Sequence, residues 1–222
     1  MKIIGHRGAK GLAPENTLLS FTKALEHGVD EIEFDVRLTK DGVAVVIHDP
    51  HLRDPDGGKI RVSTSTYKEL LAHKQDLVTF EEAMRHINKR VPALVEVKPD
   101  VDTAPIVVVT KKLLDDGWSE KDILFGSFSQ SVLRKLHKAL PQIPTVVIES
   151  WSGVRGTYRA RELGTKRLSM NHRWLWSGFI ASMKKRGYCV TPYTLNDPIV
   201  ASRMARYGVE MVITDYPDRF QK

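Results

Sequence analysis

The feature that most constrains the fold is an alternation of short β-branched runs with amphipathic segments along the 222-residue chain. Strand-like runs lie at 3–4, 30–38, 93–97, 123–126, 145–148, 167–169, 188–192 and 211–213. Residues at helical spacing separate them, near 16–28, 66–73, 79–88, 103–116, 129–139, 155–163, 174–186 and 197–206. This alternation predicts a parallel sheet, and eight strand–helix units predict a closed (β/α)8 barrel of the α/β class.

The length of the chain suits one large α/β barrel or two small domains, and the strand–helix alternation leads us to expect a single domain over residues 1–222. The 41% hydrophobic content allows one large core, and no repeat or linker interrupts the chain. Lys-Asp-Gly at 40–42 predicts a hairpin turn, from which 43–47 returns as a strand. We therefore expect a barrel with a small insertion after the second strand, at about 49–90.

Cysteine content and hydropathy bear on the location of the protein. Cys189 is the single cysteine, so no internal disulfide is possible, and the chain begins without a charged-then-apolar signal segment. These features favour a cytoplasmic protein. No apolar run approaches the ~18 residues that a membrane span requires, so we expect no stable membrane insertion.

The net charge of +7 and the pI of about 9.4 favour anionic partners, such as phosphates, anionic membrane surfaces or nucleic acid. The densest basic cluster, 155–167, is interpreted as a solvated face in preference to a partner surface. No nucleic-acid-binding motif is present, so no nucleic-acid partner is expected, whereas contact with a membrane surface stays open. Nothing in the sequence specifies an oligomeric state.

Three acids alternate with apolar residues in the strand 30–38. Because successive side chains of a strand point to opposite faces, Glu31, Glu33 and Asp35 share one face. Both faces of a parallel barrel strand are covered, so neighbouring carboxylates there would repel one another. A cation or a basic side chain must neutralise them.

Polar residues also mark the ends of the other predicted strands, where barrels of this kind carry their chemistry. These residues are His6 and Arg7, His48 after the hairpin, Glu96 and Lys98, Ser127, Glu149, Asn171, Tyr193 and Asp215. Each of them alone has an ordinary structural explanation. Together they would bring many charges to one mouth, which costs several kcal/mol per ion unless the charges pair or bind a metal.

The acids at this mouth predict a metal site. Glu33, Asp35 and Glu96 offer carboxylate oxygens without accompanying cysteines, which suits one hard divalent cation, Mg²⁺ or Ca²⁺. Such an ion would keep coordination positions open for the oxygens of a substrate.

The bases at the mouth predict anion chemistry. Arg7 and Lys98 would face an anion, and phosphate fits the planar fork of arginine. His6 and His48 titrate near neutrality, which suits one general base and one general acid. From the residues alone, the predicted activity is metal-assisted cleavage of a phosphate ester.

In order and spacing, several motifs resemble those of the glycerophosphodiester phosphodiesterase family, within the phosphatidylinositol-phosphodiesterase-like TIM barrels. They are His6-Arg7-Gly8, Ala13-Pro14-Glu15-Asn16-Thr17, Glu33-x-Asp35-Val36, Thr39-Lys40-Asp41-Gly42, His48-Asp49, Glu96-x-Lys98 and Ile213-Thr214-Asp215-Tyr216-Pro217. The resemblance covers nearly the whole chain. It implies a TIM barrel that hydrolyses small glycerophosphodiesters to glycerol 3-phosphate and an alcohol. It also implies a role in lipid and glycerol metabolism.

The resemblance implies the same division of roles among the residues. It gives the metal role to the three acids and the phosphate contacts to the Arg and Lys. By analogy, His6 is assigned as the base and His48 as the acid. Ser127, Phe128 and Tyr193 are candidates for the substrate pocket, and Tyr193 stands where the family usually has Trp.

Two alternatives to this function stay open. A lysophospholipase D would use the same site on lysophospholipids and release the head group, and aromatic residues near 174–179 make this possible. A catalytically silent barrel would bind a phosphoester or nucleic acid, but pure binding has no need of an acid and a base.

Several single residues have structural interpretations at this stage. Glu31 lies deeper along its strand than the other two acids and is expected to form a buried ion pair with Lys98 or another inward base. Glu149 is expected in a surface loop, and Trp174 and Trp176 in core or rim packing. Asp49 is expected either to hold the ring of His48 or to cap the loop.

Overall fold

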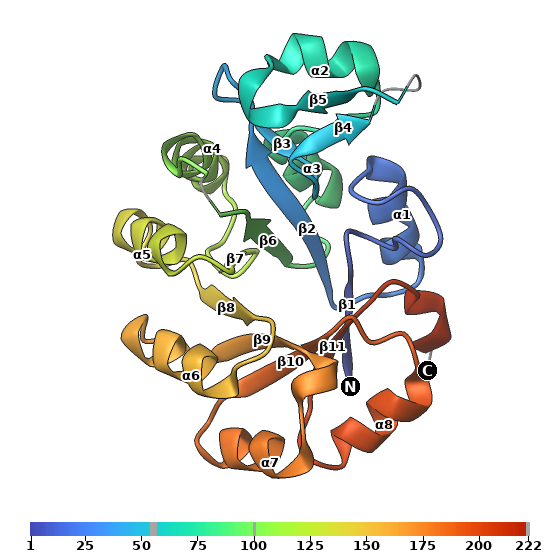
Figure 1. The fold of residues 1–222 in the computed structure, drawn as a ribbon, viewed down its shortest axis with the longest axis vertical. Coiled ribbons are helices and arrows are strands. Elements are labelled where there is room, and N and C mark those ends of the chain that lie inside the picture. Colours follow the sequence, from blue (N-terminus) through green and yellow to red (C-terminus); the bar gives the residue numbers. More distant parts are fainter. Residues whose placement is uncertain (54–56, 100, 221–222) are drawn as a thin grey trace.

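The computed structural model describes residues 1–53, 57–99 and 101–220, and within them the strands of the main sheet form a ring surrounded by helices (Figure 1). The parallel strands follow the order β10-β9-β8-β7-β6-β2-β1-β11. They are β1 (Lys2–Gly5), β2 (Glu31–Leu38), β6 (Ala93–Val97), β7 (Ile123–Ser127), β8 (Thr145–Glu149), β9 (Arg167–Asn171), β10 (Cys189–Tyr193) and β11 (Met211–Thr214). The N–H of Leu195, just after β10, donates to the carbonyl oxygen of Ile213 in β11 at 2.8 Å. The two ends of the order therefore meet, which confirms the predicted barrel, nearly closed.

The helices begin where the sequence supplies capping side chains. Thr17 and Thr79 each accept a hydrogen bond from the third residue of their helix, whose side chain bonds back to the cap. The helices of the ring are α1 (Leu18–Glu26), α3 (Phe80–Ile87), α4 (Ala104–Asp115), α5 (Gln130–Ala139), α6 (Gly153–Glu162), α7 (Ser177–Lys185) and α8 (Pro198–Ala205). Short 3₁₀ turns are η1 (Val62–Thr64), η2 (His172–Trp174) and η3 (Pro217–Phe220).

The insertion forms a small lobe at one side of the barrel mouth. Strand β3 (Ala44–Val46) pairs antiparallel with β2, as the hairpin signal predicted. Beyond it, β4 (His51–Arg53) and β5 (Lys59–Arg61) form a hairpin, and α2 (Tyr67–His73) lies over them (Figure 1). This second hairpin was not predicted, because strands of three residues are too short to show a periodicity.

The lobe has a core of its own, separate from that of the barrel. Buried apolar residues of the lobe are Val45, Ile47, Leu52, Val62, Leu70 and Leu77. Helix α3 instead packs into the main core through Phe80 and Met84, so α3 belongs to the ring. The segment outside the ring is therefore shorter than the expected 49–90.

Side chains of β2 alternate between two faces of the barrel wall, and each face borders an apolar layer. Phe34 points outward and packs between Phe21 and Phe80, with ring centroids 5.5 and 6.2 Å away, in the layer between strands and helices. Ile4, Leu94 and other apolar side chains fill a smaller cluster inside the barrel. The acids of β2 share this inner face, where they meet the chemistry of the other strand ends. Among the described residues, no helix has the length and apolar character to cross a membrane.

Candidate active site

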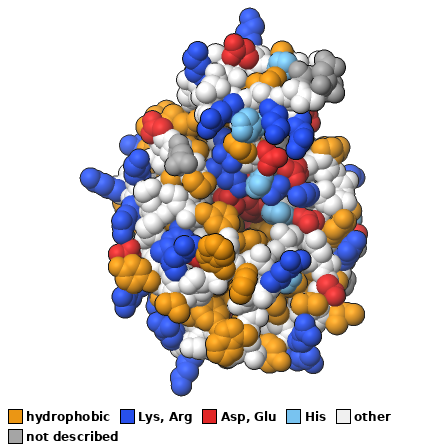
Figure 2. Space-filling view, viewed as in Figure 1, with side chains coloured by type: hydrophobic (Ala, Val, Ile, Leu, Met, Phe, Trp, Pro, Cys, Tyr) orange, Lys and Arg blue, Asp and Glu red, His pale blue; other side chains and the backbone are white. Residues whose placement is uncertain are grey.

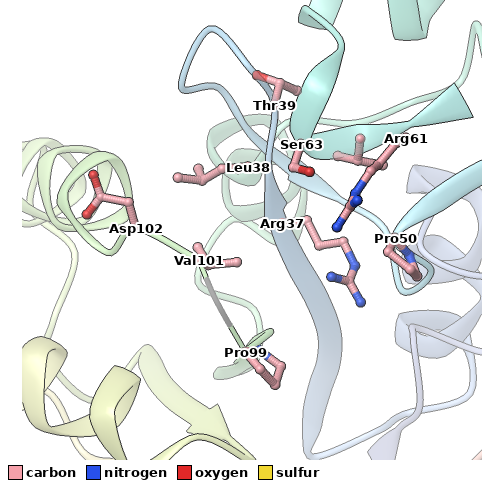
Figure 3. A pocket seen from close by; sticks show the side chains of 10 residues that line it. Arg37, Leu38, Thr39, Pro50, Arg61, Ser63, Pro99, Val101 and Asp102 are labelled. Atoms are coloured by element: carbon pink, nitrogen blue, oxygen red, sulfur yellow. The ribbon is translucent and has the colours of Figure 1, made fainter.

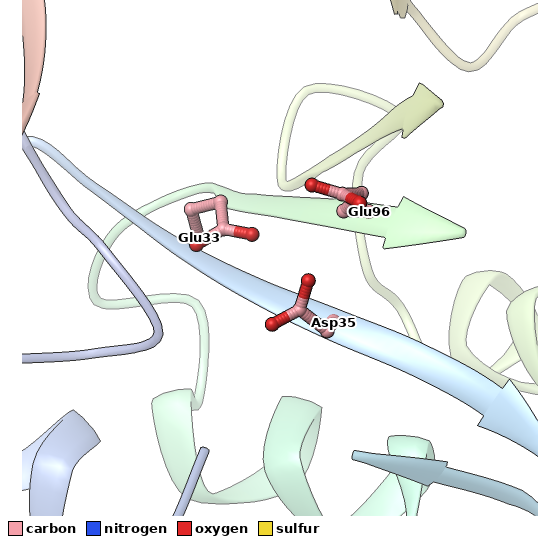
Figure 4. A group of neighbouring side chains, drawn as sticks. All are labelled: Glu33, Asp35 and Glu96. Atoms are coloured by element: carbon pink, nitrogen blue, oxygen red, sulfur yellow. The ribbon is translucent and has the colours of Figure 1, made fainter. Parts of the chain in front are cut away.

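Three buried carboxylates converge near the carboxyl ends of two adjacent strands. Glu33 and Asp35 lie on β2 and Glu96 on β6, and Asp35 is paired directly opposite Glu96 in the register of the two strands. Figure 4 shows the three side chains directed toward a common space. One oxygen of each lies within 4.8 Å of the others. Hard oxygen donors at this spacing fit a divalent cation.

The charge of this triad is only partly balanced by neighbouring bases. The ammonium of Lys98 lies 2.5 Å from Asp35 Oδ1 and also contacts Glu96, and Arg7 Nε is 3.3 Å from Asp35 Oδ2. Burial alone would raise the pKa of Asp35, but Lys98 and Arg7 outweigh it and lower this pKa. Burial also lowers the pKa of Lys98, but the carboxylates of Asp35 and Glu96 raise it overall, so Lys98 stays charged.

The negative charges of Glu33 and Glu96 are not fully offset by neighbouring bases, although Lys98 contacts Glu96. Burial and the neighbouring charges of Asp35 and Glu96 raise the pKa of Glu33 well above its ordinary value. Burial and Asp35 likewise raise the pKa of Glu96. A divalent cation bound to the three carboxylates would supply the missing positive charge, so the donor set fits such an ion in both chemistry and electrostatics.

Arg7 is held in place by an unusual backbone conformation. Its φ is +49°, and the following Gly8 has a φ of +82° with no space for a Cβ beside Ser20. This turn aims the N–H of Arg7 at Glu33 Oε2, 2.8 Å away. Arg7 Nη1 donates to both oxygens of Glu15 at 2.8 and 2.9 Å, so Glu15 fixes the guanidinium at the mouth.

His6 lies between two carboxylates. Its Nδ1 is 2.6 Å from Asp215 Oδ1, and its Nε2 is 4.0 Å from Glu33 Oε2. Burial would raise the pKa of Asp215, but hydrogen bonds from His6 and Asn196 outweigh it and lower this pKa. Because an ionised Asp215 accepts a hydrogen bond from Nδ1–H, the neutral tautomer that fits this bond leaves Nε2 as an acceptor toward the cavity.

His48 lines the same cavity as His6 and is more exposed, since 36% of its side chain is exposed against 16% for His6. Its Nδ1 is 2.7 Å from Asp49 Oδ1, and its carbonyl oxygen accepts a hydrogen bond from Arg37 Nε at 2.8 Å. Asp49 therefore holds the ring, which decides between its two expected roles. Burial is the main cause that lowers the pKa of His48.

A cavity of about 160 Å³ joins these groups. Its polar side is formed by His6, Arg7, Glu33, His48, Glu96 and Lys98. Its other side includes Phe128 and Tyr193, whose rings meet edge to face with centroids 6.2 Å apart. Burial raises the pKa of Tyr193 to about 12, so this residue presents a neutral hydroxyl.

Ser127 does not belong to this lining, contrary to expectation. It is fully buried, its Oγ donates to the carbonyl oxygen of Val97 at 2.6 Å, and it accepts the N–H of Ser129 at 3.0 Å. Its hydroxyl is used to join β7 to β6, so the pocket prediction is not supported for Ser127.

Two contacts of the site were not foreseen from the sequence. Asn16, with a φ of +58°, donates from Nδ2 to Asp35 Oδ2 at 2.9 Å and accepts the N–H of Asp35 at 3.3 Å. Asp215 orients His6, as described above. Both residues stand inside the motifs quoted from the sequence, but only the folded chain shows which side chain each one holds.

The structure confirms one prediction for the other acids and corrects another. Glu31 forms the expected buried ion pair, and its partner is the second of the two expected possibilities, another inward base, Arg167 of β9. Lys98 lies farther along the barrel with Asp35 and Glu96. Glu149 is fully buried and binds Arg155 and Arg159, so the surface-loop prediction was wrong. Glu149 ends β8, and the two arginines of α6 lie within its reach.

A second cavity of about 540 Å³ lies beside the site, between the lobe and the barrel (Figure 3). Arg37, Arg61 and Ser63 face this space, and Pro50 and Pro99 line it. Pro50 follows Asp49, and Pro99 follows Lys98. The larger cavity is therefore next to His48, with room for the part of a ligand that extends beyond the small cavity.

Comparison with known proteins is consistent with this geometry. Residues 6–219 match the sequence profile of the glycerophosphoryl diester phosphodiesterase family. The chain is 30% identical to a glycerophosphodiester phosphodiesterase of Bacillus altitudinis over 100% of this chain and 97% of the relative.

Two solved structures resemble the chain over nearly its whole length. A phosphodiesterase of Oleispira antarctica, in complex with the product sn-glycerol-3-phosphate, is 26% identical with a TM-score of 0.85, covering 99% of this chain and 94% of that one. A glycerophosphodiester phosphodiesterase of Thermotoga maritima is 26% identical with a TM-score of 0.78, covering 98% and 96%.

Proposed function

The chain belongs to the glycerophosphoryl diester phosphodiesterase family of phosphoric diester hydrolases, and on this premise we propose that it hydrolyses glycerophosphodiesters to glycerol 3-phosphate and an alcohol. The observation that carries the proposal is the meeting of three acids, two histidines, an arginine and a lysine on one cavity. The sn-glycerol-3-phosphate bound to the related Oleispira enzyme supports the choice of product.

Glu33, Asp35 and Glu96 would hold one divalent cation, Mg²⁺ or Ca²⁺. When bound, this ion would act as a Lewis acid that offsets the negative charge of the phosphate. Arg7 and Lys98 line the same cavity and present further positive charge to a phosphate there. Asn16 keeps Asp35 in position through two hydrogen bonds.

The two histidines would divide the proton transfers. His6 Nε2, the acceptor left by the bond to Asp215, would take a proton from the nucleophile, which is water or the neighbouring glycerol hydroxyl. Attack by the glycerol hydroxyl would form a cyclic phosphate, which water would then open to glycerol 3-phosphate. As the new phosphorus–oxygen bond forms and the bond to the alcohol breaks, His48 would give a proton to the leaving oxygen. The lowered pKa of His48 makes its protonated ring a stronger acid, although a smaller fraction is protonated at neutral pH.

The larger cavity would receive the leaving alcohol. It lies next to His48, the proposed acid, and its lining combines the basic Arg37 and Arg61 with Ser63 and the acidic Asp102. The proposed location of the protein remains the cytoplasm, on the evidence of the single Cys189.

Turnover of glycerophosphocholine in the presence of Mg²⁺ or Ca²⁺, with both products identified by NMR, tests the proposal. We expect glycerol 3-phosphate and choline. His6→Ala and His48→Ala should each lower the rate by about 10²–10⁴-fold, as removal of a general acid or base does. His137→Ala, on α5, is the matched control and should retain the wild-type rate. Wild-type turnover by either active-site variant would refute its assigned role.

Lysophospholipids are a second candidate substrate class, for a lysophospholipase D activity of the same site. Trp174 and Trp176 favour this candidate, because their exposed fractions of 58% and 67% exclude core packing and leave the rim position that was also expected. Comparing turnover of lysophosphatidylcholine with that of glycerophosphocholine decides between the two. A catalytically silent barrel is less favoured, because the bond from His6 to Asp215 orients a ring for proton transfer.

A further inference from the structure

The positive charge of the chain is concentrated in one segment. Residues 150–187 contain nine Lys and Arg side chains and a single acid, Glu162, whereas the other 184 residues contain 25 Lys and Arg against 26 acids. Arg155 and Arg159 pair with Glu149, Arg167 pairs with Glu31 inside the barrel, and Lys184 pairs with Glu210. The charge that this segment offers to a partner therefore comes from its other basic residues, Arg161, Lys166, Arg173, Lys185 and Arg186. This uneven distribution of basic residues between 150–187 and the rest of the chain is the first reason to examine the segment as a contact surface.

The same segment carries unusually exposed aromatic residues. Three of the four tryptophans, Trp151, Trp174 and Trp176, are 63%, 58% and 67% exposed, and the fourth, Trp118, is buried at 7%. Val154 and Tyr158 of α6 are 84% and 52% exposed. These five residues, Trp151, Val154, Tyr158, Trp174 and Trp176, are called the rim surface. Large apolar side chains gathered at one face indicate an interaction site.

An apolar groove of about 400 Å³ continues the rim surface between α6 and α7. Phe179 and Met183 contribute apolar walls, and Arg161 and Arg186 stand among the lining residues. Gly153 makes the close approach possible, because a Cβ there would lie 2.5 Å from the ring of Phe179. The groove thus combines aliphatic and aromatic walls with basic side chains.

Trp151, Trp174 and Trp176 follow the carboxyl ends of β8 and β9, so this part of the rim surface lies at the same end of the barrel as the candidate active site. Tyr193 lines the small cavity, and its hydroxyl donates at 3.0 Å to the carbonyl oxygen of Glu149, where the β8–α6 loop begins. Figure 2 shows hydrophobic side chains gathered beside the hollow that contains acids and histidines, with Lys and Arg among and around them. A partner bound to the rim surface would therefore face the mouth of the cavity.

We propose that the rim surface docks on an anionic phospholipid membrane, and that the barrel mouth then faces the lipid. Trp and Tyr side chains favour the head-group region of a bilayer, and Lys and Arg are attracted to anionic lipids. A second copy of the chain is a poorer partner, because two-fold symmetry would place the same basic patch against itself. Nucleic acid is also a poorer partner, because the sequence carries no nucleic-acid-binding motif. The proposal does not depend on the catalytic activity.

Tryptophan fluorescence tests the proposal directly, because Trp118 is buried and a change on adding vesicles reports on the rim surface. With phosphatidylcholine vesicles that contain phosphatidylglycerol, we expect a blue shift and quenching by brominated acyl chains. Trp174→Ala with Trp176→Ala should abolish sedimentation with vesicles. Arg161→Gln and Arg173→Gln should each lower the partition coefficient by roughly fivefold, and added salt should have the same direction of effect.

Matched controls lie on α4, where Val108 is also exposed. Val108→Ala and Lys111→Gln should bind vesicles like the wild type. Unchanged fluorescence with anionic vesicles, or equal binding by the rim variants, would overturn the proposal. So would concentration-dependent dimerisation lost in the tryptophan variant, or tighter binding of a single-stranded oligonucleotide than of vesicles. Turnover of glycerophosphocholine without vesicles should persist in the rim variants, which separates this proposal from the proposed activity.

Discussion

Two glutamates of β2, Glu31 and Glu33, lie on the same face of the strand two residues apart, but one is neutralised by a base and the other is not. At the beginning of the strand, both oxygens of Glu31 lie 2.9 Å from Arg167 Nη2, across the interior of the barrel. Two residues further, roughly 7 Å along the strand, Glu33 accepts the backbone N–H of Arg7 and stands beside two more carboxylates. Both glutamates are buried.

The difference shows that burial does not distinguish a structural acid from a functional one, whereas the balance of charge does. Glu31 has a guanidinium of its own, so its negative charge is offset inside the protein. Glu33 shares its surroundings with Asp35 and Glu96, and its pKa is raised well above the ordinary value by burial and by these two acids. The three acids therefore carry more negative charge than their basic neighbours offset, and such a site favours the binding of a cation.

The largest expected effect is on turnover. Glu33→Gln should lower kcat/KM by about 10³-fold or more, because it removes a proposed ligand of the cation, whose charge stabilisation is worth several kcal/mol. Glu31→Gln, the matched change two residues away, should leave kcat/KM of the folded protein within a few-fold of the wild type. Glycerophosphocholine hydrolysis measures both. An equal loss of kcat/KM in the two variants would contradict the distinction between Glu31 and Glu33.

A second effect concerns stabilisation by metal. Mg²⁺ or Ca²⁺ at 100 times its Kd should add about 2.7 kcal/mol to the free energy of unfolding, because it binds the folded chain alone. Denaturant titration with and without EDTA measures this. Glu33→Gln should remove most of the gain, and Glu31→Gln should retain it. If the wild type gains nothing from either ion, the triad is not a site for these cations.

The Glu31–Arg167 pair should contribute to stability. Glu31→Gln leaves the largely buried guanidinium without its anion, and we expect a loss of ~1–3 kcal/mol in the free energy of unfolding. The metal-free Glu33→Gln protein should instead be at least as stable as the wild type, because the change relieves repulsion. Urea titration of the two variants in EDTA makes the comparison. Greater destabilisation by Glu33→Gln would reverse the interpretation.

The smallest effect is the dependence of stability on pH without metal. Because the folded-state pKa of Glu33 is raised, its contribution is fully present below the unfolded pKa and is lost as pH rises through the folded pKa. The metal-free protein should lose up to about 1.4 kcal/mol per pH unit in that window from this one proton. Glu33→Gln should flatten the slope. Saturating divalent cation should reverse it, because the ion requires the deprotonated acid.

Much of the fold and part of the site could be predicted because they depend on local patterns. The alternation of strands and helices is a periodicity, and the common face of Glu33 and Asp35 follows from the pleat of one strand. The β4–β5 hairpin escaped prediction because its strands are only three residues long. The exposure of Trp174 and Trp176 also escaped, since helical spacing does not say which face is covered.

The sequence by itself determined the barrel, the inward direction of the acids and the positions of His6 and His48 after predicted strands, because each depends on residues that are close along the chain. The tertiary structure decided their partners. Glu31 meets Arg167 across 136 residues, and His6 meets Asp215 across 209. These contacts arise only when the ring closes, since closure brings the first and last strands together and sets opposite strands across one interior.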